Sequence, residues 1–304
     1  MKITKISVPF PIEYGYGRAT NAYLIEGETK ALVDTGIDSE SNRKFIKREL
    51  EKAGALDLNF ILLTHGHLDH YSLGTYIQSE TGATMMIHEL DSPMLEDYIG
   101  HYFSWFCELR DQAIEGGFDP GLLEEARIKL MTAASMLFKT AIFEKFNEIN
   151  LECGALRSVH LPGHTEGSVG IAIGDSVISG DVAIEGSTVV TDLRQEFESL
   201  EKLKVFSKIY AGHERTPLLR GDIDSLEGHF ISRLEEVLRA TRKGATLKEI
   251  VVTLYRGSAL ENQPYKLILP INQTVAYLRY LEAEGLVEKR GKRWISFKDS
   301  LSTR

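Results

Sequence analysis

Hydrophobic and polar residues recur with two different periods along the N-terminal third of the chain. Apolar runs or strict alternation, which are typical of strands, occur at residues 2–9, 21–26, 31–33, 59–63 and 84–88. Apolar side chains at helical spacing occur at residues 39–53 and 72–80. Strands that alternate with helices predict sheet layers covered by helices, and therefore an α/β fold.

The pattern changes between residues 91 and 150, where segments with helical spacing at 95–114 and 122–146 replace the strands. The first segment is rich in large side chains that could line a substrate pocket, namely Tyr98, His101, Tyr102 and Trp105. Tyr16, in a glycine-rich aromatic loop, either borders the same pocket or belongs to an ordinary hairpin connection. We expect either a lid over a small-molecule site or rings buried against the second helix or in a dimer interface.

Strand patterns return in the second half of the chain, at residues 156–161, 168–173, 176–179 and 207–213, with a helical segment at 197–203. After residue 217 the pattern predicts three helices and a hairpin, at residues 224–243, 246–254, 271–284 and 286–297. This is the order of elements in a winged helix. We therefore predict a catalytic domain at 1–216, with an insertion at 91–150, and a winged-helix-like domain at 222–304.

The charge of the chain is divided between these two units. The 304 residues carry a net charge of −9 at pH 7, whereas the segment from residue 222 onward holds 14 Lys and Arg against 11 Asp and Glu. An acidic chain does not suit general coating of nucleic acid or of a membrane surface. The basic turn of the hairpin is nevertheless a candidate nucleic-acid contact, through Lys289, Arg290, Lys292 and Arg293. The alternatives for this turn are solvent exposure alone and a protein partner.

The cysteines and the apolar runs bear on the compartment. Cys107 and Cys153 are far apart and lack metal-ligand spacing, so we expect no disulfide framework. The N-terminal residues lack the apolar core of a signal peptide, and no run of about 18 apolar residues occurs. We expect a cytoplasmic protein without a membrane partner, and a homodimer that uses the insertion or the C-terminal unit as its interface.

One stretch carries most of the chemistry, Thr64-His65-Gly66-His67-Leu68-Asp69-His70, directly after the apolar run at residues 59–63. His65 and His67 alternate with a glycine, so both side chains can project the same way from an extended segment. Asp69 and His70 follow the turn and can face a second ion. Neutral imidazole is the commonest metal ligand, and zinc accepts nitrogen and oxygen donors. We therefore predict a metal site at this stretch.

Three further candidate ligands share the same setting, because each closes an apolar strand pattern beside glycine. They are His164, Asp181 and His213. Ligands that are distant in sequence but emerge at strand ends can converge at one edge of a sheet. With the four ligands of the motif they supply a shell for two metal ions, which we expect to be zinc, with iron or manganese as alternatives.

The pattern His-x-His-x-Asp-His, followed by single His, Asp and His residues after strands, resembles the metallo-β-lactamase superfamily. The resemblance covers roughly residues 1–216 apart from the insertion, and implies an αββα sandwich with the site at one edge of two facing sheets. The ligands that it implies for the first metal are His65, His67 and His164. The ligands that it implies for the second metal are Asp69, His70 and His213. It also implies that Asp181 bridges the metals and that Asp34 orients the site through hydrogen bonds.

The implied chemistry is metal-assisted hydrolysis, because two adjacent dications lower the pKa of a water between them. Asp69 would also orient the attacking hydroxide. Asp181 stands where the most studied β-lactamases have Cys, which disfavours antibiotic hydrolysis. His67 stands where redox di-iron members have Glu, which disfavours an O₂ or NO reductase.

Two branches of the superfamily resemble the chain in different ways. The C-terminal unit is similar to that of lactamase-beta-2-like proteins, which include a ribonuclease for single strands, whereas the insertion fits a closed pocket, as in glyoxalase II-like members. The leading prediction is a dinuclear zinc hydrolase for a small ester, thioester or lactone. The alternatives are a metal-dependent ribonuclease or phosphodiesterase, a mononuclear iron persulfide dioxygenase, and a metal-bearing regulatory protein that works through its winged helix.

Overall fold

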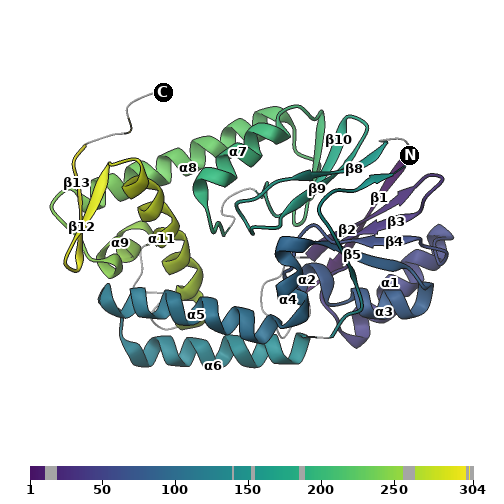
Figure 1. The fold of residues 1–304 in the computed structure, drawn as a ribbon, viewed down its shortest axis with the longest axis horizontal. Helices are drawn as coiled ribbons and strands as arrows, with labels where there is room; N and C mark the ends of the chain where they lie inside the picture. Colours follow the sequence, from purple (N-terminus) through teal and green to yellow (C-terminus); the bar gives the residue numbers. More distant parts are fainter. Residues whose placement is uncertain are drawn as a thin grey trace.

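Two β-sheets lie face to face in the molecule, with helices on their outer sides and further helices beyond one end (Figure 1). The computed structural model describes residues 1–10, 19–138, 140–151, 155–184, 189–255, 264–298 and 301. Tyr16 and Cys153 lie outside these described residues. Within them, no helix is both long enough and apolar enough to cross a membrane.

The first sheet combines an antiparallel and a parallel half. Its strands, in order across the sheet, are β1 (Lys2–Pro9), β2 (Ala19–Glu26), β3 (Ala31–Val33), β4 (Phe60–Leu62), β5 (Thr84–His88) and β6 (Glu144–Phe146). β1, β2 and β3 pair antiparallel, and β3 to β6 pair parallel. The parallel half places the C-terminal ends of β3 and β4 side by side, where polar residues follow both strands.

The second sheet is mostly antiparallel. Its strands, in order across the sheet, are β11 (Lys208–Ala211), β10 (Ser176–Gly180), β9 (Val169–Ile173), β8 (Leu156–His160) and β7 (Asn150–Leu151). β10 and β11 pair parallel, whereas the other neighbours pair antiparallel. The C-terminal ends of β10 and β11 therefore also lie at one edge.

Buried side chains join these sheets and their helices into four layers. Tyr23 and Leu62 of the first sheet meet Ile171 and Ile178 of the second in the apolar layer between them. On the outer face of the first sheet lie α1 (Glu40–Ala53) and α3 (Gly74–Thr81). On the outer face of the second lies α7 (Leu193–Leu203). The predicted αββα sandwich is confirmed.

The ends of α1 follow from its sequence. The side chain of Ser39 accepts a hydrogen bond from the backbone N–H of Asn42 at 3.1 Å, which is a normal N-cap contact. At the other end Gly54 has a φ of +64°, the left-handed conformation that glycine adopts without a steric cost. Capping residues therefore set both ends of the predicted helix.

The helical insertion consists of η2 (Glu89–Asp91), α4 (Ser92–Glu96), α5 (Tyr98–Glu115) and α6 (Pro120–Leu137). The predicted second helix, 122–146, is wrong at its end, because α6 stops at Leu137 and residues 144–146 form β6. This strand gains backbone hydrogen bonds with β5, and Phe146 is buried in the layer between the sheets. Sheet pairing outweighs the helical spacing that the local sequence shows.

The C-terminal elements occur in the predicted order of three helices and a hairpin. They are α8 (Arg220–Thr241), α9 (Leu247–Tyr255), η4 (Pro264–Leu267), α11 (Ile268–Ala283), β12 (Val287–Arg290) and β13 (Arg293–Ser296). Thr246 caps α9 as predicted, because its hydroxyl accepts from the backbone N–H of Glu249 at 3.3 Å. The winged-helix assignment and the domain boundaries stay predictions.

The insertion packs on the C-terminal elements. Phe106 and Leu109 of α5 lie in the same cluster of buried side chains as Ile271 and Leu278 of α11. This cluster also contains Leu200 of α7, so it continues to the helix layer of the second sheet. The apolar side of α5 is therefore covered within the chain, by elements that lie far away in sequence.

Candidate metal centre

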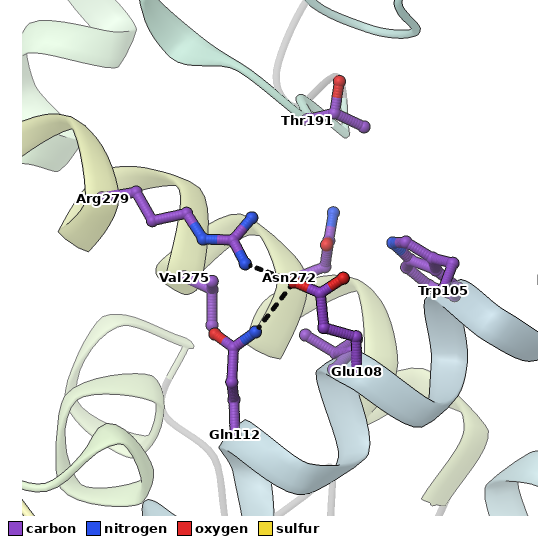
Figure 2. A pocket seen from close by; sticks show the side chains of 8 residues that line it. Trp105, Glu108, Gln112, Thr191, Asn272, Val275 and Arg279 are labelled. Carbon is purple, nitrogen blue, oxygen red and sulfur yellow. Dashed lines mark hydrogen bonds and ion pairs between the residues drawn. The ribbon is translucent and has the colours of Figure 1, made fainter.

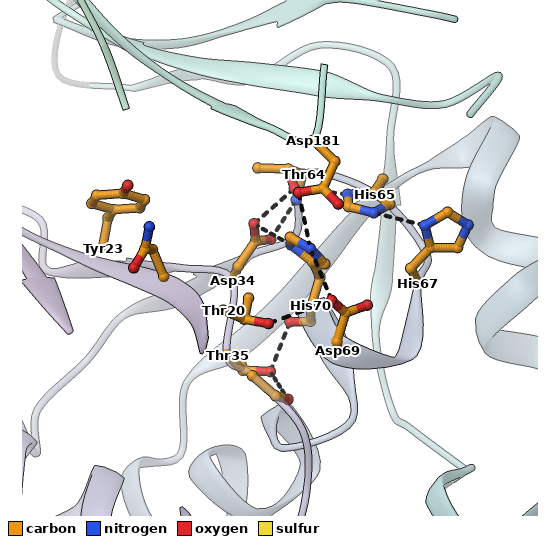
Figure 3. Close-up of polar contacts among 12 residues, drawn as sticks. Thr20, Tyr23, Asp34, Thr35, Thr64, His65, His67, Asp69, His70 and Asp181 are labelled. Carbon is orange, nitrogen blue, oxygen red and sulfur yellow. Dashed lines mark hydrogen bonds and ion pairs between the residues drawn. The ribbon is translucent and has the colours of Figure 1, made fainter. Parts of the chain in front are cut away.

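The seven predicted ligands meet at the sheet edge where the strands end. Figure 3 shows His65, His67, Asp69, His70 and Asp181 among them. His65 and His67 follow β4, and Asp69 and His70 lie in the short helix α2 (Leu68–Tyr71). The remaining three ligands follow β8, β10 and β11 respectively and are His164, Asp181 and His213. Their donor atoms form three overlapping groups, each within 4.8 Å: His65, His67 and His164; His65, His70 and Asp181; Asp69, His70 and His213.

Three imidazoles make up the first group. The Nδ1 atom of His67 lies 3.0 Å from Nε2 of His65 and 2.9 Å from Nε2 of His164. The Nδ1 atom of His164 lies 2.6 Å from the carbonyl oxygen of Val189. Because a carbonyl only accepts, Nδ1 of His164 carries the proton and Nε2 is left as a ligand atom.

The imidazoles of the first group are neutral near pH 7. Burial lowers the pKa of His67 to about 3. Burial also lowers the pKa of His164, and burial with the neighbouring imidazoles lowers the pKa of His65 well below its ordinary value. A neutral imidazole is the form that binds a metal, so this group needs to lose no proton first.

We call Asp69, His70 and His213, together with Asp181, the second group; it combines two carboxylates with two imidazoles. His213 Nε2 lies 3.3 Å from Asp69 Oδ2 and 3.2 Å from Asp181 Oδ2, and His70 Nε2 lies 3.3 Å from Asp181 Oδ1. Burial opposes the charge on Asp69, but His70 and His213 hold the pKa of Asp69 at about 2. Burial opposes the charge on His213, but Asp181 and Asp69 raise the pKa of His213 to about 10. A cation at this group would replace protons on imidazoles.

Two buried atoms at the centre test whether the residues fit a cation. His70 Nε2 and Asp181 Oδ1 face each other at 3.3 Å without forming a hydrogen bond, and neither atom makes one to any other described residue. A buried polar atom without a partner costs about 1–3 kcal/mol, and a cation between the two would satisfy both. Imidazole nitrogen and carboxylate oxygen together suit zinc, iron or manganese. The donor set therefore fits a divalent metal site.

Asp34 supports the second group from behind. Its Oδ2 accepts from Nδ1 of His70 and from the Thr64 hydroxyl, each at 2.8 Å, and its Oδ1 accepts from the Thr64 backbone N–H at 2.8 Å (Figure 3). The bond to Nδ1 directs Nε2 of His70 into the centre. Asp34 itself has a φ of +58°, a strained conformation for a residue with a Cβ.

Glycines let the second sheet approach the centre. A Cβ on Gly212 would lie 2.3 Å from Asp181 Oδ1 and 2.8 Å from Cε1 of His70. A Cβ on Gly180, whose φ is +56°, would lie 2.4 Å from the hydroxyl of Thr64. The glycine beside each of these ligands, noted in the sequence, is therefore required by close packing.

Strand β2 holds the loop that carries His213. The Nδ1 atom of His213 lies 2.9 Å from the carbonyl oxygen of Ala19, and Asn21 Nδ2 donates to the carbonyl of Ala211 at 3.1 Å. The Tyr23 hydroxyl donates to the same carbonyl at 2.6 Å. The sequence analysis missed this support, although a buried Asn in the otherwise apolar run at residues 21–26 was a signal.

Asp91 joins the two loops that carry the first group. This fully buried carboxylate accepts from the backbone N–H groups of Gly66 and Gly167 at 2.9 Å and 2.8 Å, and from the Thr165 hydroxyl at 2.7 Å. Gly66 lies between the first two histidines, and Thr165 directly follows His164. The sequence analysis missed Asp91, because no motif or spacing distinguishes it from other polar residues at the start of the insertion.

The four predicted pocket residues on α5 divide into two kinds. Tyr98 is buried, and its ring lies 6.4 Å from the ring of Tyr71 in α2, the helix that carries Asp69 and His70. The ring of Tyr98 stacks on Tyr102 with centroids 5.8 Å apart, and Tyr102 contacts Trp105 at 4.9 Å. His101 is exposed instead. An aromatic row thus runs along α5 away from the centre.

Three of the four basic hairpin residues form ion pairs within the chain, and the fourth, Lys292, is exposed at the turn. Lys289 and Arg293 form ion pairs at 2.7 Å and 3.0 Å with carboxylates of α5 and α9, and Arg290 pairs with a carboxylate of its own strand. Lys289 also lies over the ring of Trp294. These pairs give the residues a role in packing the hairpin, and contact with nucleic acid stays a prediction.

Known proteins share both the sequence and the fold of the chain. A sequence model described as the metallo-beta-lactamase superfamily matches residues 15–249. A probable metallo-hydrolase of Methanocaldococcus jannaschii is 27% identical over 213 residues, 66% of this chain and 89% of that protein. A hydroxyacylglutathione hydrolase of Vibrio vulnificus is 25% identical over 199 residues, 64% of this chain and 62% of that protein. An acyl-coenzyme A thioesterase of Homo sapiens is 28% identical over 187 residues, which are 58% of this chain and 62% of that protein.

The fold is shared over almost the whole chain. A crystal structure of a metallo-beta-lactamase family protein from Thermus thermophilus superposes with a TM-score of 0.74 and 24% identity, over 97% of this chain and 98% of that one. This coverage includes the insertion and the C-terminal elements. The superfamily model matches well over half of the residues, and the His and Asp clusters fit its metal chemistry. The chain therefore belongs to the metallo-β-lactamase superfamily and is a hydrolase of that superfamily with a candidate His and Asp metal site.

Proposed function

We propose that the protein uses two divalent cations, zinc in the leading case, to hydrolyse a small ester, thioester or lactone, with thioesters as the first class to test. The observation that carries the proposal is the meeting of seven donor side chains from four separate segments. The relatives named as a thioesterase and as a hydroxyacylglutathione hydrolase support this substrate class.

The groups of donors suggest how the cations would be held. The imidazole group would hold one, and the group of Asp69, His70 and His213 would hold the other. Asp181 would contribute to both, because its Oδ2 atom lies 3.9 Å from Nε2 of His164 in the imidazole group and 3.2 Å from Nε2 of His213 in the other group. Cations held there would lower the pKa of a water and polarise the carbonyl under attack.

Two side chains of the protein would act on the water and the substrate. Because His70 and His213 hold the pKa of Asp69 at about 2, this side chain is a carboxylate near pH 7. It would orient the water by accepting a hydrogen bond from it, and would not act as a general base. The Thr20 hydroxyl, 3.4 Å from Asp69 Oδ2, would fix the direction of the carboxylate. Burial raises the pKa of Tyr98 well above its ordinary value, so this side chain, which contacts α2, would act as a neutral hydrogen-bond donor to the substrate.

The competing functions have weaker support. For a ribonuclease, the hairpin cations would have to leave the ion pairs that they form within the chain. For a mononuclear dioxygenase, the group of Asp69, His70 and His213 would be superfluous, whereas its side chains are oriented by Asp34 and by the Ala19 carbonyl. A regulatory protein that works through its C-terminal elements would not need all seven candidate metal ligands, yet the chain keeps them together.

The test measures metal content, thioester hydrolysis and cleavage of single-stranded RNA on one preparation. We expect about two zinc equivalents per chain and thioester hydrolysis that a chelator abolishes. His164→Ala should abolish turnover, whereas His229→Ala, on α8 and away from the centre, should not. RNA cleavage without thioester hydrolysis would contradict the proposal in favour of a nuclease, and one iron per chain would contradict it in favour of oxidation.

A further inference from the structure

A small cavity lies between the insertion and the C-terminal helices (Figure 2). Its volume is about 70 Å³, and its walls come from α5, from α11 and from the segment before α7. It is lined by Trp105, Glu108, Leu109, Gln112, Thr191, Asn272, Val275 and Arg279. Trp105 is the end of the aromatic row that starts at Tyr98, next to α2.

The amide of Asn272 is the unexplained group in this cavity. Asn272 is 92% buried, yet its Nδ2 atom makes no hydrogen bond to any residue in the described ranges. Figure 2 shows the amide pointing away from α11 toward Thr191, into the space between Trp105 and Arg279. A buried amide donor without a hydrogen-bond partner costs about 1–3 kcal/mol. An unpaired donor that points into a cavity therefore favours a ligand that accepts a hydrogen bond from it.

The charged residues of the cavity cancel each other. Arg279 Nη2 lies 2.9 Å from Glu108 Oε1, and Gln112 donates to the same carboxylate oxygen at 3.4 Å. The cavity therefore offers an aromatic wall and an amide donor without a net charge. This combination suits a neutral carbonyl oxygen, as in an amide, better than a carboxylate.

Hydrogen bonds connect the cavity to the loop of His164. Thr191, on the cavity wall, donates to the carbonyl of Gly163 through both its backbone N–H and its hydroxyl, each at 2.8 Å. The backbone N–H of Val190 donates to the side chain of Gln273, the residue after Asn272, at 3.0 Å. The cavity thus shares the short segment at 189–191 with the metal centre, since Val189 accepts from His164.

We propose that this cavity binds the non-reacting arm of the substrate and that Asn272 donates a hydrogen bond to a neutral carbonyl oxygen on that arm. The inference rests on the proposed hydrolase function and narrows its substrate to esters or thioesters that carry an amide-type group. The aromatic row of α5 would line the path between the arm and the bond under attack. Binding of a remote group positions the reacting bond, so its loss lowers kcat as well as binding.

The first test uses Trp105 as the reporter. The chain has two tryptophans, so Trp294→Phe leaves Trp105 as the single tryptophan, which can be excited apart from the tyrosines at 295 nm or above. Three probes share a methylthioethyl arm that ends in an N-acetyl amide, a carboxylate or a methyl group. We expect the amide probe to change Trp105 emission saturably and to bind more tightly than the carboxylate and methyl probes.

Variants then distinguish the contribution of the Asn272 amide to probe binding from the contribution of the cavity shape. Asn272→Leu should weaken binding of the amide probe about tenfold, as expected for one buried hydrogen bond, and should leave binding of the methyl probe unchanged. Val275→Leu fills the cavity but keeps the donor, and should weaken all probes. Leu269→Ala, on the exposed side of α11, is the matched control. Circular dichroism confirms that each variant folds.

Turnover separates this inference from the proposed function. With the metal-loaded enzyme, Asn272→Leu should lower kcat/KM more for a thioester with an amide arm than for a plain alkyl thioester, whereas Leu269→Ala should change neither value. Probe binding without hydrolysis of any thioester would overturn the proposed function but keep the cavity as a ligand site. Thioester hydrolysis with equal binding of all probes, or with no effect of Asn272→Leu, would overturn the cavity inference alone. Preference for the carboxylate probe would overturn the assignment to a neutral group.

Discussion

The two halves of the metal centre are built from different chemistry. The half formed by His65, His67 and His164 consists of neutral imidazoles whose pKa values are lowered by burial. The half around Asp69 and His213 contains carboxylates that hold protons on neighbouring imidazoles. One half is ready to bind a cation, and the other must exchange protons for it.

The surroundings of the two halves differ in the same way. The imidazole half is held by Asp91, which joins two loops through backbone N–H groups and a hydroxyl. The carboxylate half is held by Asp34, which contacts a ligand imidazole directly. In the imidazole half, the positions of the two loops place the ligands. In the carboxylate half, the orientation of the His70 imidazole does so.

The largest expected effect comes from removing one ligand from each half. We expect His164→Ala and His213→Ala each to lower thioester kcat/KM by more than the 10–100-fold typical of outer-shell residues. Each variant should retain about one metal equivalent, because the other half keeps its ligands. Elemental analysis with steady-state kinetics measures both. Full loss of both metals in either variant would show that the halves do not act separately.

A smaller effect is expected from the supporting carboxylates. Asp34→Asn should weaken the ion of the carboxylate half and Asp91→Asn that of the imidazole half, each by about 10–100-fold. Competition with a chromophoric chelator measures the two affinities in turn. Equal weakening of both ions by Asp91→Asn would contradict the division of roles between the two aspartates.

The third prediction concerns pH. The pKa of His67 is about 3 in the folded protein, whereas an exposed histidine has a pKa of 6.5. The unfolded chain therefore binds the proton first, and the metal-stripped protein should lose stability as pH falls from 6.5 toward 3. The pKa of His213 is about 10 in the folded protein, against 6.5 for an exposed histidine. The folded protein therefore holds this proton more tightly than the unfolded chain, and the resulting stability should be lost as pH rises from 6.5 toward 10. Thermal unfolding across pH should therefore peak near pH 6.5.

Zinc provides the control for this profile. A cation displaces the proton of His213, so the alkaline loss of stability should disappear in the metal-loaded protein. Binding of the ion in the carboxylate half should also release protons at pH 7.5, which calorimetry in buffers of different ionisation enthalpy detects. Identical alkaline branches with and without zinc would argue against a site at His213.

The smallest effect is expected at the hairpin. Exposed ion pairs contribute about 0–1 kcal/mol each, so Lys289→Ala and Arg293→Ala should lower the free energy of unfolding only slightly. Neither should change hydrolysis of a small thioester. Measurement of RNA binding at several salt concentrations tests the alternative role of these residues. A steep salt dependence that the substitutions flatten would favour nucleic-acid contact.

The sequence predicts that the seven His and Asp side chains meet, because four of them form a dense motif and the other three follow apolar strands. The spacing of apolar residues predicts an α/β fold with sheets covered by helices, and the resemblance to the superfamily supplies the αββα order of the layers. Asp91 and Asn272 escape prediction because their partners are distant backbone groups or a cavity, and no local pattern marks them. The packing of α5 on α11 also escapes, because it joins two apolar faces from different parts of the chain.

The most direct test of the account is the number of metal equivalents at which thioester turnover saturates when zinc is added back to stripped protein. The account predicts that turnover rises with the second equivalent and reaches its maximum near two per chain. Maximum turnover at one equivalent, or turnover that persists after chelation, would contradict a hydrolase that depends on both halves of the centre.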